Sequence, residues 1–188
     1  PQVEGGECLE IYPKLERGEI DVAFLSAFEK HRGDKLSVEG FPVFEDEVVM
    51  VVNKSHPFAG RPYISLREIA REKLIAPSKN SGLYQDITDA CRAAGFDPRF
   101  SYSSQYVDTA LGLVAEGLGV TLFSSCTVLN TLWKNVEFVR IQPKIHRVIS
   151  LVYLKKNKNS PVVANFIKFF QQGGLQGKLP NNVVELVR

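Results

Sequence analysis

The sequence predicts an α/β protein in which helices flank a mostly parallel sheet. Apolar stretches of strand length alternate along the chain with amphipathic stretches of helix length, an order typical of parallel sheets. Residues 103–125 (SSQYVDTALGLVAEGLGVTLFSS) contain one complete unit of helix, turn and buried strand. The composition agrees, since 44% of the 188 residues are hydrophobic and 23% are charged, as in ordinary globular proteins.

The first elements are a helix and a buried strand. Residues 7–17 have helical apolar spacing, but Pro13 removes a backbone donor and clashes with the preceding turn, so we expect a kink at Pro13 or a helix that begins there. A strand is expected at 20–25. The charged segment 28–35 is interpreted as a surface loop, with a partner contact as the alternative.

Two strands are predicted next, at 36–44 and 48–52. Three consecutive carboxylates, Glu45, Asp46 and Glu47, stand between them. We interpret this acidic run as a solvated turn rather than as a metal site.

The middle of the chain continues the alternation of strands and helices. Ser65 precedes a short apolar run and can cap a helix, and Gly95 can end the helix before it without strain. The elements expected here are a turn at 55–62, a helix at 66–71, a strand at 73–76, a helix at 83–94 and a strand at 99–103.

The stretch 103–125 then gives the clearest pattern. Apolar residues recur at i, i+3, i+4 and i+7 from Val107 to Val114, which places them on one helical face. Ser104 is the expected N-cap, and Gly117 is expected to end the helix in the left-handed conformation. A buried strand should follow at 119–123.

The remaining chain should contain further strands and one amphipathic helix. We expect a helix at 127–132, strands at 136–141 and 148–154, a basic loop at 155–160 and a helix at 162–171. The tail 173–188 is rich in glycine at its start, so disorder is expected, with a strand at 183–187 as the alternative.

Three motifs together resemble one protein family. LVAEGLG followed by VTLFSS is similar to the pattern LVAxGxGxxLLP of the effector-binding domain of LysR-type transcriptional regulators, with Phe123-Ser124 in place of the usual Leu-Pro. ERGEIDVAF (16–24) resembles the family's GELDLAI. VVMVVNKSHPFAGRPYISLREIAREKLI (48–75) resembles its strand, HPLA turn and SLxDL helix. The resemblance runs from residue 1 to about residue 171.

This resemblance implies a two-lobed fold like that of type-2 periplasmic binding proteins. Each lobe is expected to be a mostly parallel sheet flanked by helices, and two crossing strands, 48–52 and 148–154, are expected to join the lobes. The first lobe would comprise 1–47 and 155–172, the second 48–154, and the tail 173–188. Compared with the family, the first lobe is expected to lack its first strand and helix, and a DNA-binding domain is expected upstream.

Small polar residues follow four of the predicted strands and indicate a ligand site. In open α/β sheets, ligands bind at the carboxyl ends of strands, where helix N-termini favour anions. The resemblance singles out the positions of Ser26 and Gln105 in the family's cleft. The candidate ligand-binding residues are Ser26, Ser78, Asn80, Ser103, Ser104, Gln105 and Ser124. Neutral donors, with Lys79 nearby, favour a small anionic metabolite.

Metal, cofactor and catalytic motifs are not evident. The three cysteines, Cys8, Cys91 and Cys126, are an odd number without CxxC spacing, and the three histidines are far apart. Ser124 lies at a strand-to-helix turn, but no GxSxG elbow surrounds it. We therefore expect neither metal nor cofactor, and no enzymatic activity.

The expected partners follow from the charge and from the resemblance. A net charge of +2 does not favour DNA binding by this chain itself, so DNA contact would belong to the upstream domain. The resemblance implies a homodimer or tetramer formed through the helix at 106–116. No membrane segment and no signal peptide are seen, so a cytoplasmic regulator is expected. A solute-binding protein of a transport system, with the same fold, is the alternative.

Overall fold

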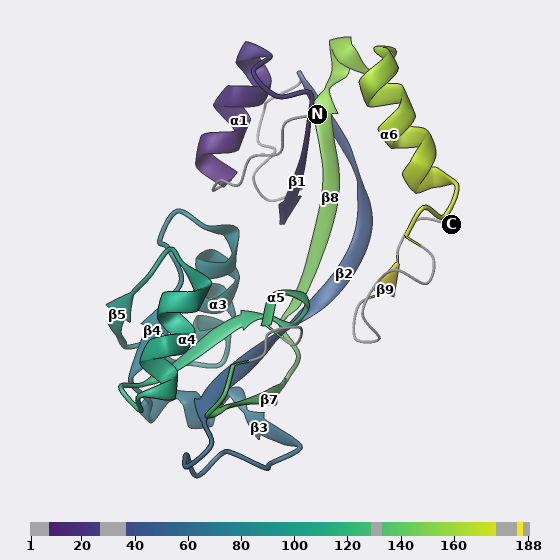
Figure 1. Ribbon diagram of the computed structural model, residues 1–188. Helices are drawn as coiled ribbons and strands as arrows, with labels where there is room; N and C mark the ends of the chain where they lie inside the picture. The colour runs from purple at the N-terminus through teal and green to yellow at the C-terminus, as the bar shows by residue number, and fades with distance from the viewer. Residues whose placement is uncertain (1–7, 27–36, 129–132, 176–183, 186–188) are drawn as a thin grey trace. The chain divides into compact units, whose positions relative to one another are not determined.

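The computed structural model describes residues 8–26, 37–128, 133–175 and 184–185 (Figure 1). The chain divides into two compact units: unit 1 comprises Pro1–Asp46 and Arg147–Arg188, and unit 2 comprises Glu47–His146. It therefore passes from unit 1 to unit 2 once and returns once. The predicted loop 28–35 and the last part of the predicted helix 127–132 lie outside the described residues.

In the described residues, unit 1 is built on a sheet with one helix on each face. Its strands are β1 (Val22–Ser26), β8 (His146–Leu154) and the first half of β2 (Val38–Asn53). β1 and β8 are antiparallel, and β8 also neighbours β2. The helices are α1 (Cys8–Arg17) and α6 (Pro161–Gln171), and the 3₁₀ helix η2 (Lys155–Asn157) joins β8 to α6.

Alternation along the strands divides the core of unit 1 between these helices. Ala23 and Leu25 pack beneath α1. On the other face, Phe24 contacts Phe170 of α6, and Val22 packs against the core cluster that contains Phe170. Successive side chains of a strand point to opposite faces, so both faces need a cover. The core beneath α1 consists of Tyr12, Leu15, Ala23, Leu25, Val38, Val152 and Leu154.

Helix α1 continues through Pro13, contrary to the expectation of a helix that begins there. The proline costs one intrahelical hydrogen bond. Tyr12 and Leu15, on either side of it, are 5% and 0% exposed. Burial of these two side chains against the sheet offsets the lost bond.

The predicted turn at 45–47 is wrong, because β2 is one continuous strand of 16 residues. Asp46 and Glu47 are 2% and 8% exposed, so these two residues of the acidic run are not solvated. Within unit 2, Glu47 lies 3.5 Å from Arg140 Nε and 3.2 Å from Lys144 Nζ. These cations compensate the buried carboxylate and allow the strand to continue.

Part of the C-terminal tail forms a strand, as in the alternative to disorder. β9 (Val184–Glu185) pairs antiparallel with β2, with Glu185 opposite Phe44 and Val184 opposite Glu45. The tail therefore adds a strand to an edge of the unit 1 sheet.

Unit 2 contains a mixed sheet with its parallel strands on one side. The second half of β2 pairs antiparallel with both β6 (Val120–Ser124) and β7 (Val136–Gln142). β4 (Leu74–Ala76) is parallel to β6 and to β5 (Phe100–Ser103), and β3 (Tyr63–Ser65) is parallel to β7. Along the chain, β3, β4, β5 and β6 alternate with helices, as the sequence predicts.

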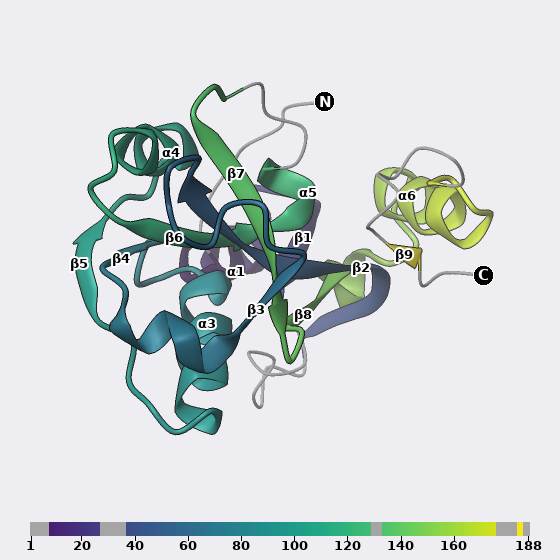
Figure 2. The ribbon, with the colours of Figure 1, turned by 90° about the horizontal axis from the view of Figure 1, so that it is seen from below.

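The helices of unit 2 cover this sheet on both faces, with α3 (Gly82–Ala93) opposite α4 (Val107–Ala115) (Figure 2). Ser65 caps the 3₁₀ helix η1 (Leu66–Arg71) through a capping box with Glu68. Gly95 and Gly117 have φ values of 92° and 72°, as expected for residues that end helices.

No helix in the described ranges has both the length and the apolar character needed to span a membrane.

Candidate functional site

The carboxyl ends of three parallel strands meet at one edge of unit 2. In the β4–β5 pair Ala76 lies opposite Ser103, and in the β4–β6 pair Ile75 lies opposite Thr121. The Ser104 N–H donates to Ala76 O at 3.0 Å, and Thr121 Oγ1 donates to Ile75 O at 2.7 Å. A helix begins shortly after each strand, so free backbone N–H groups gather here.

The loop after β4 brings Ser78 and Asn80 to this edge. Ser81 is the N-cap of α3: its hydroxyl accepts from the Tyr84 N–H at 3.2 Å and donates to Ser78 O at 2.7 Å. The Asn80 N–H donates to Ser78 Oγ at 3.4 Å. Asn80 is exposed and Ser78 is half-buried.

The loop after β5 carries Ser103, Ser104 and Gln105. The prediction that Ser104 is the N-cap of α4 is wrong. The Ser104 hydroxyl instead closes a local turn, because it accepts from the Tyr106 N–H at 3.1 Å and donates to Tyr106 O at 2.9 Å. Tyr106 is the N-cap and makes no side-chain cap hydrogen bond. The start of α4 therefore lacks a side-chain cap, while Ser103 and Gln105 are exposed beside it.

Ser124, at the end of β6, is 4% exposed, and its hydroxyl lies 3.5 Å from Cys126 Sγ. Ser125 begins the four-residue helix α5 (Ser125–Val128) and is fully buried. The geometry thus gives Ser124 a packing role inside unit 2 in addition to its place at the edge.

Ser26 belongs to unit 1, where it ends β1 opposite Ile149 and is 7% exposed. The other six candidates lie in unit 2. Among these, the pairing of β4 with β5 and β6 brings the three loops together. All seven positions remain predictions as ligand contacts.

The unit 2 edge provides hydroxyl, amide and backbone N–H donors, with the exposed Lys79 as the neighbouring cation. Such a set suits a carboxylate or a related anion. In the part of the chain that the structure describes, no three His, Cys, Asp or Glu side chains gather in a way that could hold a metal ion.

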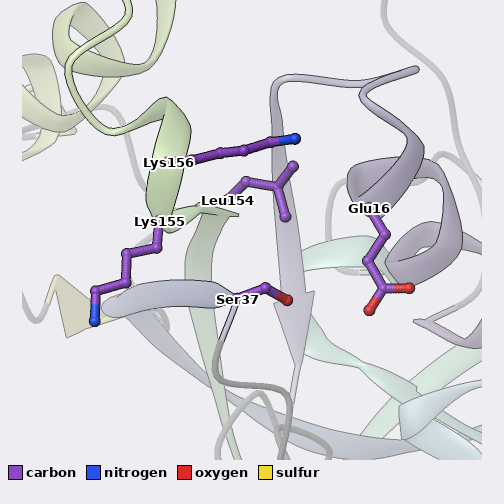
Figure 3. Close-up of a pocket in the computed structure, with 5 residues that line it drawn as sticks. All are labelled: Glu16, Ser37, Leu154, Lys155 and Lys156. Carbon is purple, nitrogen blue, oxygen red and sulfur yellow. The ribbon is translucent and has the colours of Figure 1, made fainter.

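A cavity in unit 1 escaped the sequence analysis. It has a volume of ≈ 610 Å³ and is lined by Glu16, Ser37, Leu154, Lys155 and Lys156 (Figure 3). The available signal was the basic loop predicted at 155–160, which by itself does not indicate a cavity. The sequence could not show that the opposite wall comes from α1.

Comparison with known proteins shows that most of the chain matches one family model. Residues 2–174 match the family model described as the LysR substrate binding domain. A curated relative, the uncharacterized HTH-type transcriptional regulator YybE of Bacillus subtilis, is 26% identical over 157 residues, which cover 83% of this chain and 52% of YybE. The chain spans about half the length of the first curated relatives it matches.

Solved structures give the same result. The effector binding domain of QuiR, in complex with shikimate, matches with a TM-score of 0.77 and 26% identity, covering 90% of this chain and 78% of that one. The regulatory domain of CcmR from Synechocystis, in complex with 2-PG, matches with a TM-score of 0.76 and 17% identity, covering 87% and 78%. These neighbours confirm the predicted fold class.

Proposed function

Because the chain belongs to the LysR substrate binding domain family, we propose that it senses a small anionic metabolite for a transcriptional regulator. The match over residues 2–174 is the observation that supports this most directly. The family comprises regulators, so catalysis is not part of the proposal. The same match favours a regulator over the alternative of a transport solute-binding protein.

The proposed ligand contacts are the seven strand-end residues, of which Ser26 and Gln105 are the first choice. The loops of unit 2 offer neutral donors and uncapped helix N–H groups, which favour an anion. QuiR was solved with shikimate and CcmR with 2-PG, both of which suit the same chemical class.

We further propose that ligand binding is transmitted to a DNA-binding domain and that the chain self-associates, as a homodimer or tetramer, in the cytoplasm. The relative YybE is described as an HTH-type regulator, and the chain covers 52% of it. Exposed Tyr102, Tyr106 and Leu118 flank α4 and provide apolar surface for a second copy.

A thermal-shift screen of small organic acids, including shikimate and 2-PG, tests the ligand class. At one hundred times its Kd, a ligand adds about 2.7 kcal/mol to the free energy of unfolding. We expect at least one acid to raise Tm by several degrees and its neutral methyl ester to be inactive.

The site is tested by Ser26→Ala and Gln105→Ala, with Gln171→Ala as the matched control at the exposed end of α6. Each site substitution should reduce the shift, and the control should leave it unchanged. A stabilising acid that is unaffected by both site substitutions would contradict the proposed contacts.

A further inference from the structure

We infer that the α6 face of the unit 1 sheet is a docking surface for an amphipathic helix whose apolar stripe is flanked by carboxylates. Four large apolar side chains of this face are exposed. They are Phe24 of β1, which is 44% exposed, and Val162, Phe166 and Phe169 of α6, which are 47%, 38% and 45% exposed. All four belong to unit 1, and none is among the strand-end candidates.

The two faces of the unit 1 sheet are covered unequally. Among the described residues, seven side chains form the buried core beneath α1. The buried core beneath α6 has three members there, Val43 of β2, Leu151 of β8 and Phe170 of α6 itself. Helix α6 therefore covers β2 and β8, whereas Phe24 of β1 stays largely exposed on the same face.

The spacing of helices and strands favours a second helix on this face. Neighbouring strands lie about 4.8 Å apart and packed helices about 8–10 Å apart, so one helix covers about two strands. The described strands follow the order β1, β8, β2, which places β1 beyond the two strands that α6 covers. A helix beside α6 would complete this layer.

The exposed stripe of α6 borders the uncovered strand. Val162, Phe166 and Phe169 are spaced by four and three residues, which is the spacing of a helix–helix seam. Phe170, one turn after Phe166, contacts Phe24 of β1 with ring centroids 5.4 Å apart. A helix in this place would therefore contact α6 and β1 together.

The aromatic part of this surface is held in position. Phe24 and Phe169 each pack edge-to-face against the buried Phe170, with centroid distances of 5.4 and 5.1 Å. The Phe169 ring also lies so close to Gly174 that no Cβ would fit there. Rings that are ordered before binding lose little conformational freedom when a partner docks, so they suit an interface.

The charge around α6 selects the flanks of the partner. Residues 155–175 contain four lysines and no aspartate or glutamate. Lys155 and Lys158 lie 3.8 and 3.2 Å from Glu39. Lys168, in the last turn of α6, makes no ion pair with any residue that the structure describes. A second copy would bring its own lysines to this surface, so a helix flanked by carboxylates is the better complement.

The test uses three model peptides of about 18 residues, a length at which helices form in water. The first has a leucine stripe flanked by glutamates, the second has the same stripe flanked by lysines, and the third has the composition of the first in shuffled order. Fluorescence anisotropy of each labelled peptide measures its binding to the whole 188-residue chain. We expect the glutamate-flanked helix to bind at least about tenfold more tightly than either of the others.

Phe24→Thr and Val162→Gln each remove one apolar contact and should raise the Kd of the glutamate-flanked peptide about fivefold or more. Tyr63→Thr is the matched control for Phe24→Thr, because Tyr63 is an aromatic residue of a strand that is 51% exposed but belongs to unit 2. Lys168→Glu should narrow the preference for glutamate over lysine flanks. Circular dichroism shows that each variant is folded.

The proposal would be overturned by a glutamate-flanked peptide that binds no better than either of the other two, or by Phe24→Thr and Val162→Gln both without effect. A loss of binding in Tyr63→Thr as large as in Phe24→Thr would also overturn it. A dimer in sedimentation equilibrium that Val162→Gln disrupts would assign this face to a second copy instead. The proposed effector site is followed separately, through the acid response of Gln105→Ala.

Discussion

At the residue scale, two glycines of unit 2 have opposite surroundings. A Cβ at Gly119 would lie 2.5 Å from Lys73 O, a backbone atom that cannot move aside easily. A Cβ at Gly112, within α4, would meet only Trp133 Cη2 at 3.8 Å, an ordinary contact. Gly119 is therefore required by the close approach of two strands, whereas Gly112 is not.

We predict that Gly119→Ala lowers the free energy of unfolding of unit 2 by about 1–3 kcal/mol, because the added methyl forces the backbone apart. Gly112→Ala should be neutral or stabilise by up to about 1 kcal/mol through helix propensity. Urea unfolding followed by the fluorescence of Trp133, the single tryptophan, measures both. Equal midpoints for the two variants would contradict the close contact at Gly119.

Cys91 is a second residue whose surroundings give a defined expectation. It is fully buried in α3, and burial raises the pKa of its thiol from 9.0 to about 11. The unfolded thiol loses its proton first as the pH rises, so the contribution to stability is constant below pH 9 and falls between about pH 9 and pH 11.

We predict that in a Cys8→Ser background a maleimide labels Cys126 rapidly at pH 8 and Cys91 only as fast as unit 2 unfolds. Rapid labelling of both thiols in the folded chain would show that Cys91 is accessible.

Cys91→Ala should remove up to about 2–3 kcal/mol of the pH dependence of the free energy of unfolding between pH 9 and pH 11.

At the scale of elements, the sequence predicted most helices and strands but placed a turn at 45–47, where β2 continues without interruption. The apolar run 103–125 contains enough local information, through its spacing and Gly117, to define helix and strand. The acidic run 45–47 does not, because the burial of Glu47 depends on Arg140 and Lys144, almost one hundred residues away in sequence. Pairing across such separations is not visible in a local pattern.

The start of α4 shows the same limit at a cap. Ser104 has the right chemistry for an N-cap, but the backbone turns back two residues later, and the helix begins after Tyr106. A serine hydroxyl can close a turn or cap a helix, and only the path of the chain decides between them.

We predict that Tyr106→Asn stabilises unit 2 relative to Tyr106→Ala by about 0.5–2 kcal/mol, because Asn can accept from the orphan N–H groups and Ala cannot. Tyr106 is 65% exposed, so both substitutions remove little packing. Unfolding midpoints of the two variants give the difference. No difference would mean that water or another group already satisfies these N–H groups.

At the scale of the whole molecule, the candidate site divides into a part the sequence predicted and a part it missed. Strand-end serines and amides could be found because strands of one parallel sheet end at one edge, and β4, β5 and β6 confirm this arrangement. The unit 1 cavity could not, because its lining comes from α1, the start of β2 and η2, which only the fold brings around one space. The resemblance to a family supplied the rest of the expected site.

The two units also differ in how their cores are connected along the chain. Among the described residues, the 25 buried members of the core that runs from Val48 to Ile145 all lie inside the single segment Glu47–His146. The cores of unit 1 combine residues from two separate segments. Unit 2 therefore has the continuity expected of an independently folding domain.

We predict that a polypeptide of residues 46–146 folds alone, because it retains the whole of that core, the pairing of β2 with β6 and β7, and the ion pairs of Glu47. Its amide NMR spectrum should overlay that of the intact chain for residues remote from 46 and 146.

Leu111→Ala, in the core of unit 2, should destabilise the fragment and the intact chain alike, by about 2–5 kcal/mol. Leu15→Ala, which the fragment does not contain, should destabilise unit 1 of the intact chain and leave Trp133 of unit 2 with an unchanged unfolding midpoint. A fragment without dispersed amide shifts, or a Trp133 transition that moves with Leu15→Ala, would instead show that unit 2 depends on unit 1 for its stability.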